Sequence, residues 1–270
     1  MSKPQSNWLF YLAIAACIGG VLWYSADDIR PLLEELRGKK SAPAQIVTPA
    51  ASGPRFPIEP STPDAAAAEQ SGLYPLPPLA ESDGYFRAIL LNIFGDDLDT
   101  LLANNELIAK FVATVDGLDA AKPSRKVWPV KVSLAEFQAV AVEDASGQFV
   151  QSPENYARFD FLITMATHPA PATLIDAYKH LYPLFQETYI GMGYPDGYFN
   201  DRLVEIIDHL LSTPQPAEPI LLVQPRVYYQ FADPKLEALS GGQKLLIRMG
   251  PANAAKLRPL LQAIRQGIVE

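Results

Sequence analysis

The 270-residue sequence has a single cysteine, Cys17, which lies in an apolar segment near the N-terminus. The remainder therefore cannot form an internal disulfide, a thiolate metal site or a cysteine nucleophile. The sequence also lacks the G-x-x-x-x-G-K-[S/T] phosphate loop and the G-x-S-x-G nucleophile elbow. These absences exclude P-loop ATPases and hydrolases that depend on that elbow.

Positive charge is scarce as well. The net charge is −8, and residues 81–270 alone carry 23 acidic against 16 basic residues, a net of −7. A nucleic-acid-binding protein needs a cationic surface to displace counterions from phosphates, so we expect no nucleic-acid partner. Because 49% of the residues are apolar, the chain can build a sizeable core.

The longest uncharged apolar run is Trp8–Tyr24, with aromatic residues at both of its ends. As a helix its 17 residues span about 26 Å, and the aromatic ends suit the two membrane interfaces. We therefore predict a transmembrane anchor over residues 1–25 that enters the lipid bilayer through residues 8–24. A cleaved signal peptide and a lipoprotein acylated at Cys17 are the alternatives.

The charges that flank this run bear on its orientation. Lys3 precedes it and four basic residues follow it by residue 40, which by itself favours a cytoplasmic domain. Three of those four lie more than ten residues beyond the helix, however, and Asp27 and Asp28 come first. By analogy with other short N-terminal anchors, we predict a single-pass protein of the bacterial inner membrane whose soluble domain is periplasmic.

A proline-rich stretch separates the anchor from the soluble domain. Residues 26–40 are predicted to form a juxtamembrane helix, and residues 41–80 hold nine prolines among Ala, Ser and Thr. Proline removes amide donors and fixes φ, so residues 41–80 are predicted to be a disordered linker with no regular structure.

Residues 81–270 have helical periodicity and are predicted to form a mainly α, irregular helical domain with at most a short β-hairpin. Ser82 and Asp83 are expected to cap the first helix, which ends near Gly95. Later helices are expected at 172–190, at 198–212 and from Pro251, and the hairpin at 137–150.

The run Leu239–Gln243 spells LSGGQ, the signature of ABC-transporter ATPases. Without a phosphate loop these letters cannot serve nucleotide hydrolysis. We interpret Ser240 as a helix cap, followed by two glycines in a crowded first turn.

The most distinctive stretch is the Pro-Asp-Gly turn at 195–197 and the helix after it. Asp201, Glu205, Asp208 and His209 fall on one face of that helix and could form a metal or acid–base site. The alternative is a capped helix whose acidic residues pair with Arg202 or with neighbouring cations. The candidate binding residues are Tyr194, Asp196, Tyr198, Asn200, Asp201, Arg202, Glu205 and His209; no catalytic residue, metal ligand or cofactor is assigned.

Tyrosines are numerous near this stretch and elsewhere. They could line a protein- or glycan-binding surface, or they could fill a small core with their hydroxyls at its edge. The tyrosines in question are Tyr182, Tyr189, Tyr194, Tyr198, Tyr228 and Tyr229.

Three blocks, Asn155–Asp160, Leu181–Leu211 and Ser240–Pro251, resemble a bacterial family known as domain of unknown function 3014. The resemblance implies an N-terminal membrane segment and a helical domain, and it carries over no activity. Our leading hypothesis is a membrane-anchored interaction or scaffolding module of the cell envelope with a protein or envelope-glycan partner. The alternative hypothesis is a metal- or acid/base-dependent hydrolase that uses the acidic residues after the turn.

Overall fold

The structure is a computed structural model that describes residues 53–58, 76–131, 137–143 and 147–270. Residues from Ser52 onward form one compact unit. None of the described helices has both the length and the apolar run that a bilayer crossing requires. The predicted anchor at 1–25, the juxtamembrane helix at 26–40 and Cys17 lie outside the described residues.

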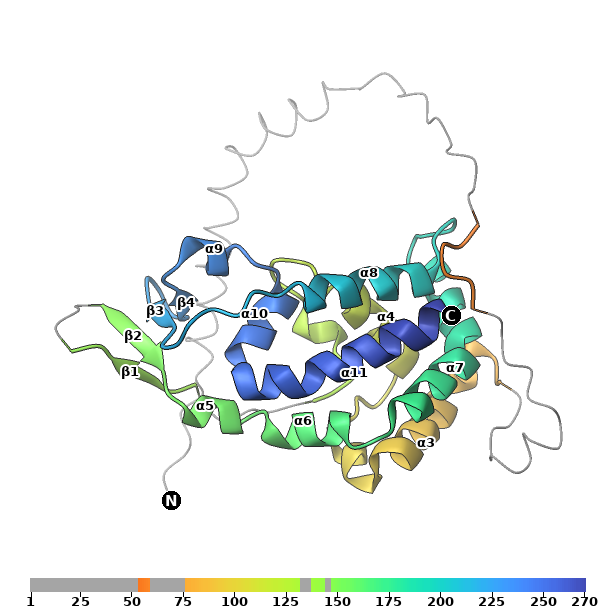
Figure 1. Cartoon of the computed structure of the whole chain (residues 1–270). Helices are drawn as coiled ribbons and strands as arrows, with labels where there is room; N and C mark the ends of the chain where they lie inside the picture. Colours follow the sequence, from red (N-terminus) through yellow and green to blue (C-terminus); the bar gives the residue numbers. More distant parts are fainter. Residues whose placement is uncertain (1–52, 59–75, 132–136, 144–146) are drawn as a thin grey trace, which may run out of the picture. The chain divides into compact units, whose positions relative to one another are not determined.

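The unit is mainly helical, as predicted. The elements in chain order are η1 (Leu79–Glu81), α3 (Ser82–Phe94), η2 (Asp96–Leu101), α4 (Leu107–Asp116), η3 (Arg125–Val127), β1 (Ala139–Ala141), β2 (Gln148–Gln151), α5 (Glu154–Ala157), α6 (Asp160–Thr167), α7 (Pro171–Gly191), α8 (Phe199–Leu211), β3 (Leu221–Val223), β4 (Gln230–Phe231), α9 (Pro234–Glu237), α10 (Gly241–Arg248) and α11 (Pro251–Val269). Figure 1 shows α8 and α11 running beside each other, with the strands at the opposite end from α7.

The prediction of at most one short β-hairpin was wrong. The hairpin β1–β2 exists, but β3 and β4 extend it to a four-stranded antiparallel sheet in the order β1-β2-β3-β4. Val150 pairs with Leu221, about 70 residues later in the chain. Strands of two and three residues are too short for alternation to reveal, and a partner so distant in sequence leaves no local signal.

The cap predicted for α3 also differs. Ser82 is the first residue of α3, and its hydroxyl donates to the Leu79 carbonyl. The Asp83 carboxylate instead accepts the Glu106 and Leu107 amides, both at 2.7 Å. Asp83 therefore caps α4, and it fixes the start of that helix against α3.

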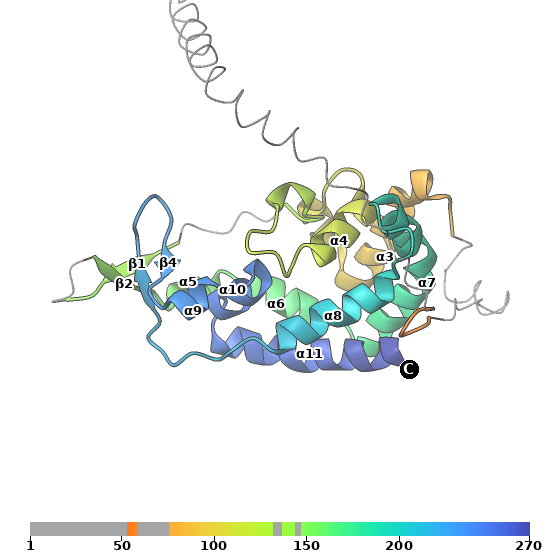
Figure 2. The ribbon, with the colours of Figure 1, turned by 90° about the horizontal axis from the view of Figure 1, so that it is seen from above.

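The main core lies between α3, α4, α7, α8 and α11. Its centre is a cluster of aromatic rings in which Phe185 packs against Phe86, Phe111, Tyr178 and Phe199. Figure 2 shows α8 and α11 along one side of this bundle, with α3 and α4 on the other side of α8. A second, smaller core lies under the sheet around Leu222, Phe231 and Ile247.

A buried imidazole links α3 to α7. His180 is 7% exposed, and its Nε2 lies 2.5 Å from the Tyr85 hydroxyl. Burial disfavours the charged imidazolium, so the pKa of His180 is lowered below its usual value of 6.5.

This lowered pKa predicts a loss of stability in weak acid. The unfolded chain binds the proton more readily, so the contribution is fully present above pH 6.5 and is lost as the pH falls toward the folded pKa. Urea unfolding at pH 7.5 and pH 5.5 should show a smaller pH difference for His180→Gln than for the wild type. The same change at the exposed His168 should leave the difference unaltered; equal differences in all three proteins would contradict the prediction.

Candidate functional site

The predicted site residues lie on the turn after α7 and along α8. Asp196 lies on the exposed turn, and Tyr198 is the half-buried residue before α8. The structure gathers Tyr194, Arg202 and Glu205 into one polar network. It places His209 in a different contact, with α10.

The centre of the site is a short segment of the chain itself, residues 53–58, which bends at Arg55 and Phe56 and which we call the docked segment. The Asp201 carboxylate accepts the amide of Arg55 at one oxygen and the amide of Phe56 at the other, both at 2.9 Å. The Asn200 side chain donates to the Phe56 carbonyl at 2.8 Å. Two adjacent residues of α8 therefore hold the main chain of the docked segment.

Side chains of the docked segment add to this main-chain contact. Phe56 and Ile58 pack, partly buried, against the main core. The Arg55 guanidinium bonds to the Glu205 carboxylate, with side chains that are 57% and 50% exposed. Such an exposed ion pair contributes at most about 1 kcal/mol, whereas a hydrogen bond to a charged carboxylate contributes about 1.5–3 kcal/mol. Asp201 and the apolar contacts therefore hold the segment, and Glu205 adds a preference for a basic side chain.

Figures 1 and 2 both show the docked segment, in orange, beside the C-terminal end of α11. Asn200 explains why these segments meet. Its side chain is fully buried, donates to the carbonyls of Phe56 and Ile268 at 2.8 Å each, and accepts the Tyr178 hydroxyl at 3.1 Å. One amide group thus joins the docked segment, α7 and α11 to α8.

Arg202 connects the site to the end of α4. It bonds to the side chain and the carbonyl of Asp116 at 2.8 and 2.6 Å, to Asp119 at 2.9 Å, and approaches Glu205 at 3.7 Å. Burial alone lowers the pKa of Arg202, but the bonds to Asp116 and Asp119 outweigh it and the net pKa is raised. Arg202 therefore remains charged and links Glu205 to the end of α4.

Tyr194 completes this network. Its ring stacks on Tyr189 with the centroids 4.5 Å apart, and its hydroxyl donates to Asp116 at 3.1 Å. The pKa of Tyr194 is raised, first by the charge of Asp116 and then by this hydrogen bond. Of the other tyrosines, Tyr189 is buried and Tyr228 is 82% exposed. Tyr189 therefore fills the core, whereas Tyr228 is available to a binding surface.

His209 takes part in a structural contact between α8 and the start of α10. Its Nε2 lies 2.8 Å from the Ser240 hydroxyl, which itself accepts the Gln243 amide at 3.2 Å as the cap of α10. Asp208, one residue earlier, pairs with Arg265 of α11. The polar residues on this face of α8 therefore contact three different parts of the fold: the docked segment, the start of α10, and α11.

The LSGGQ run lies at this helix start, and its glycines allow close packing. The amides of Gly241 and Gly242 donate to the carbonyls of Ala120 and Leu118 at 2.8 and 2.9 Å. Both amides are used within the protein, so this helix start is a packing contact with the loop after α4.

Gly241→Ala is expected to lower the free energy of unfolding by about 1–3 kcal/mol, the usual cost of overpacking. A Cβ at Gly241 would lie 2.1 Å from Cδ of Pro123, a rigid ring that cannot rotate away. Chemical denaturation should show the loss. The control is Gly84→Ala in α3, where a Cβ meets nothing within 4 Å and no loss is expected; equal stabilities of the two variants would contradict this account.

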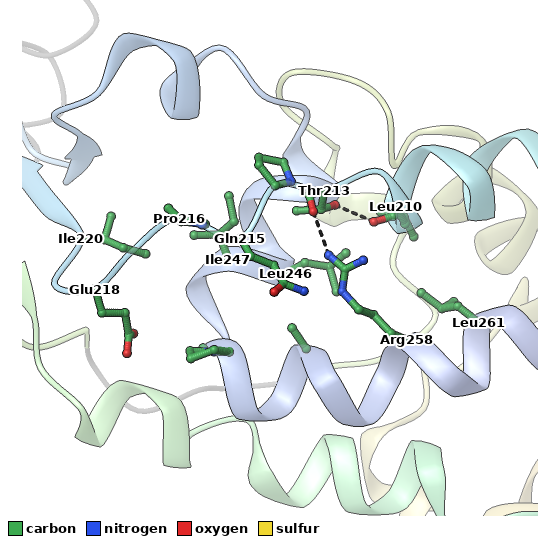
Figure 3. A pocket seen from close by; sticks show the side chains of 14 residues that line it. Leu210, Thr213, Gln215, Pro216, Glu218, Ile220, Leu246, Ile247, Arg258 and Leu261 are labelled. Atoms are coloured by element: carbon green, nitrogen blue, oxygen red, sulfur yellow. Dashed lines mark hydrogen bonds between the residues drawn. The ribbon is translucent and has the colours of Figure 1, made fainter.

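A small cavity of about 50 Å³ lies between α10, α11 and the 213–220 loop. Figure 3 shows Leu246, Ile247 and Leu261 around it, with Arg258 rising from α11 toward Thr213. The Arg258 guanidinium donates to the carbonyls of Leu211 and Thr213 at 2.8 and 2.7 Å. These bonds brace the loop, and the cavity has room for little more than water.

Arg55 and Phe56 are the site residues that sequence reasoning missed, because they lie inside the predicted linker. Arg55 is the only basic residue among 41–80, and Phe56 is one of two aromatics there. That departure from the surrounding composition was the available signal. Within the described ranges, no group of three His, Cys, Asp or Glu side chains could hold a metal ion.

The model of a known protein family, described as Protein of unknown function (DUF3014), matches residues 107–265. The chain belongs to this family. No curated protein and no solved structure matches it. In this DUF3014 protein the matched region contains Asn200, Asp201 and Glu205, whereas the docked segment lies outside it.

Proposed function

We propose that this DUF3014 protein is a non-enzymatic interaction module that binds a short peptide segment of a partner protein on α8. The observation that carries the proposal is the contact of Asn200 and Asp201 with three main-chain groups of the docked segment. In peptide recognition, main-chain hydrogen bonds supply affinity and side-chain contacts supply specificity. We name the contacting residues Asn200, Asp201 and Glu205 the α8 contact surface.

A protein partner suits this surface better than an envelope glycan. Asp201 accepts two successive amides, a pattern that a peptide backbone supplies. The acidic character of the surface likewise favours a basic peptide and disfavours nucleic acid. We further propose that residues 8–24 anchor the module in the bacterial inner membrane and that the module works on the periplasmic side.

The geometry does not favour the alternative hypothesis of a hydrolase. Asp201 is bonded to main-chain amides, Glu205 to Arg55, and His209 to Ser240. General acid–base catalysis needs a carboxylate or imidazole that can reach a substrate proton. Within the described residues, these three side chains are instead bonded to parts of the fold.

A labelled peptide with the sequence of residues 51–60 tests the proposal. Because the docked segment occupies the surface, the acceptor is the full chain with Arg55→Ala and Phe56→Ala. From a few charge-assisted hydrogen bonds and two apolar side chains, we expect a Kd on the order of 10⁻⁴ M by fluorescence anisotropy.

Two further variants of that acceptor identify the contact. Adding Asp201→Ala should weaken binding at least tenfold, because two bonds are lost. Adding Glu187→Ala, on the exposed side of α7, should change nothing. Circular dichroism confirms that each variant is folded, and a folded acceptor that shows no saturable binding would contradict the proposed function.

A further inference from the structure

The docked segment is continuous with the chain that precedes the domain. Only residues 59–75 separate Ile58 from Leu76, where the described chain resumes. A segment tethered through 17 residues meets its own binding surface at an effective concentration in the millimolar range. The chain therefore competes with any partner for the same surface.

We propose that residues 53–58 are an intramolecular competitor that closes the α8 contact surface and is displaced by a partner peptide of like chemistry. This inference rests on the proposed function, since it concerns the same surface. The regulated event is the release of Arg55 and Phe56 from α8.

The contacts define which peptide can replace the segment. Asp201 must receive two consecutive amides, so neither of these two positions can be proline. The first of them faces Glu205 and suits arginine, and the second suits an aromatic ring that packs against the core. Pro54 and Pro57 flank the pair, and because proline fixes φ, the free segment has fewer conformations to lose on binding. The partner segment is therefore an Arg–aromatic pair between prolines that can bend as the docked segment does.

Release would also lengthen the tether of a membrane-anchored chain. With the segment docked, residues 26–52 connect the proposed anchor to the domain, and after release residues 26–75 do so. Release therefore frees residues 53–75, which lengthen the tether by at most roughly 80 Å at the extended length per residue. Partner binding would thus increase the distance from the bilayer that the domain can reach.

The test compares peptide affinity between chains in which the competitor is intact and chains in which its side-chain contacts are removed. The full-length protein in detergent is titrated against the labelled 51–60 peptide, as wild type and with Arg55→Ala plus Phe56→Ala. With a Kd on the order of 10⁻⁴ M and a millimolar effective concentration, the wild type should bind about tenfold more weakly. Arg55→Ala alone, which removes one exposed ion pair, should give an intermediate affinity and is the variant least able to affect folding.

A matched control replaces Arg226 and Tyr228, another arginine and aromatic, on the exposed β3–β4 loop. That double alanine variant should bind as weakly as the wild type. Equal, saturable binding by the wild type and the Arg55/Phe56 variant would overturn the competitor and leave the peptide-binding function in place. An absence of saturable binding in every folded variant would overturn the proposed function and the competitor together.

Discussion

Phe199→Ala is expected to lower the free energy of unfolding by about 3–5 kcal/mol, the range for deleting a fully buried phenylalanine. The Phe199 side chain is 0% exposed and packs against the rings of Phe111, Tyr178, Phe185 and Tyr189. These rings come from α4 and α7, so the substitution opens a cavity at the point where both helices meet α8. Urea denaturation of the compact unit measures the loss.

The control for Phe199 is Phe161→Ala, which removes the same side chain from α6. Phe161 is 55% exposed, and truncation at exposed sites usually changes stability by less than about 0.5 kcal/mol. A Phe199 variant no less stable than the Phe161 variant would show that the aromatic cluster is not the centre of the core.

Asn200→Ala is expected to cost about 3 kcal/mol, although the side chain is small. Its removal leaves the Ile268 carbonyl and the Tyr178 hydroxyl buried without their partner, and each unmade buried bond costs about 1–3 kcal/mol. The Phe56 carbonyl loses its donor as well, so the docked segment should loosen. Denaturation gives the stability, and amide exchange at Phe56 reports the docked segment separately.

Asn92→Ala on the exposed side of α3 is the matched control, for which a change within about 0.5 kcal/mol is expected. If Asn200→Ala behaved like Asn92→Ala, the buried amide would not be the link between α7, α11 and the docked segment.

The helices were predicted well because short-range sequence patterns, namely apolar spacing and capping residues, mark them. The spacing of apolar residues predicted α7 and α8, and Ser240 caps α10 as expected. Each of these signals lies within one helix and its caps. The strands β3 and β4 escaped prediction because their pairing partners are distant in sequence and each strand is too short to show a period.

Only the α8 side of the site was predictable from the sequence. The Pro-Asp-Gly turn and the helix after it placed Asn200, Asp201 and Glu205 among the eight candidate binding residues. What they bind was not predictable, because Arg55 and Phe56 lie about 145 residues earlier, in a stretch whose prolines indicate a linker. Proline excludes helix and inner strand, but it does not exclude a short irregular segment held by side chains.

Amide exchange at Arg55 and Phe56 in the full-length protein tests most directly whether α8 holds a peptide segment. Both amides donate to Asp201, so both should exchange far more slowly than the Gly53 amide, and the protection should vanish in Asp201→Ala. Exchange at Arg55 and Phe56 as fast as at Gly53 in the wild type would mean that the segment is not bound, and the peptide-binding account would be wrong.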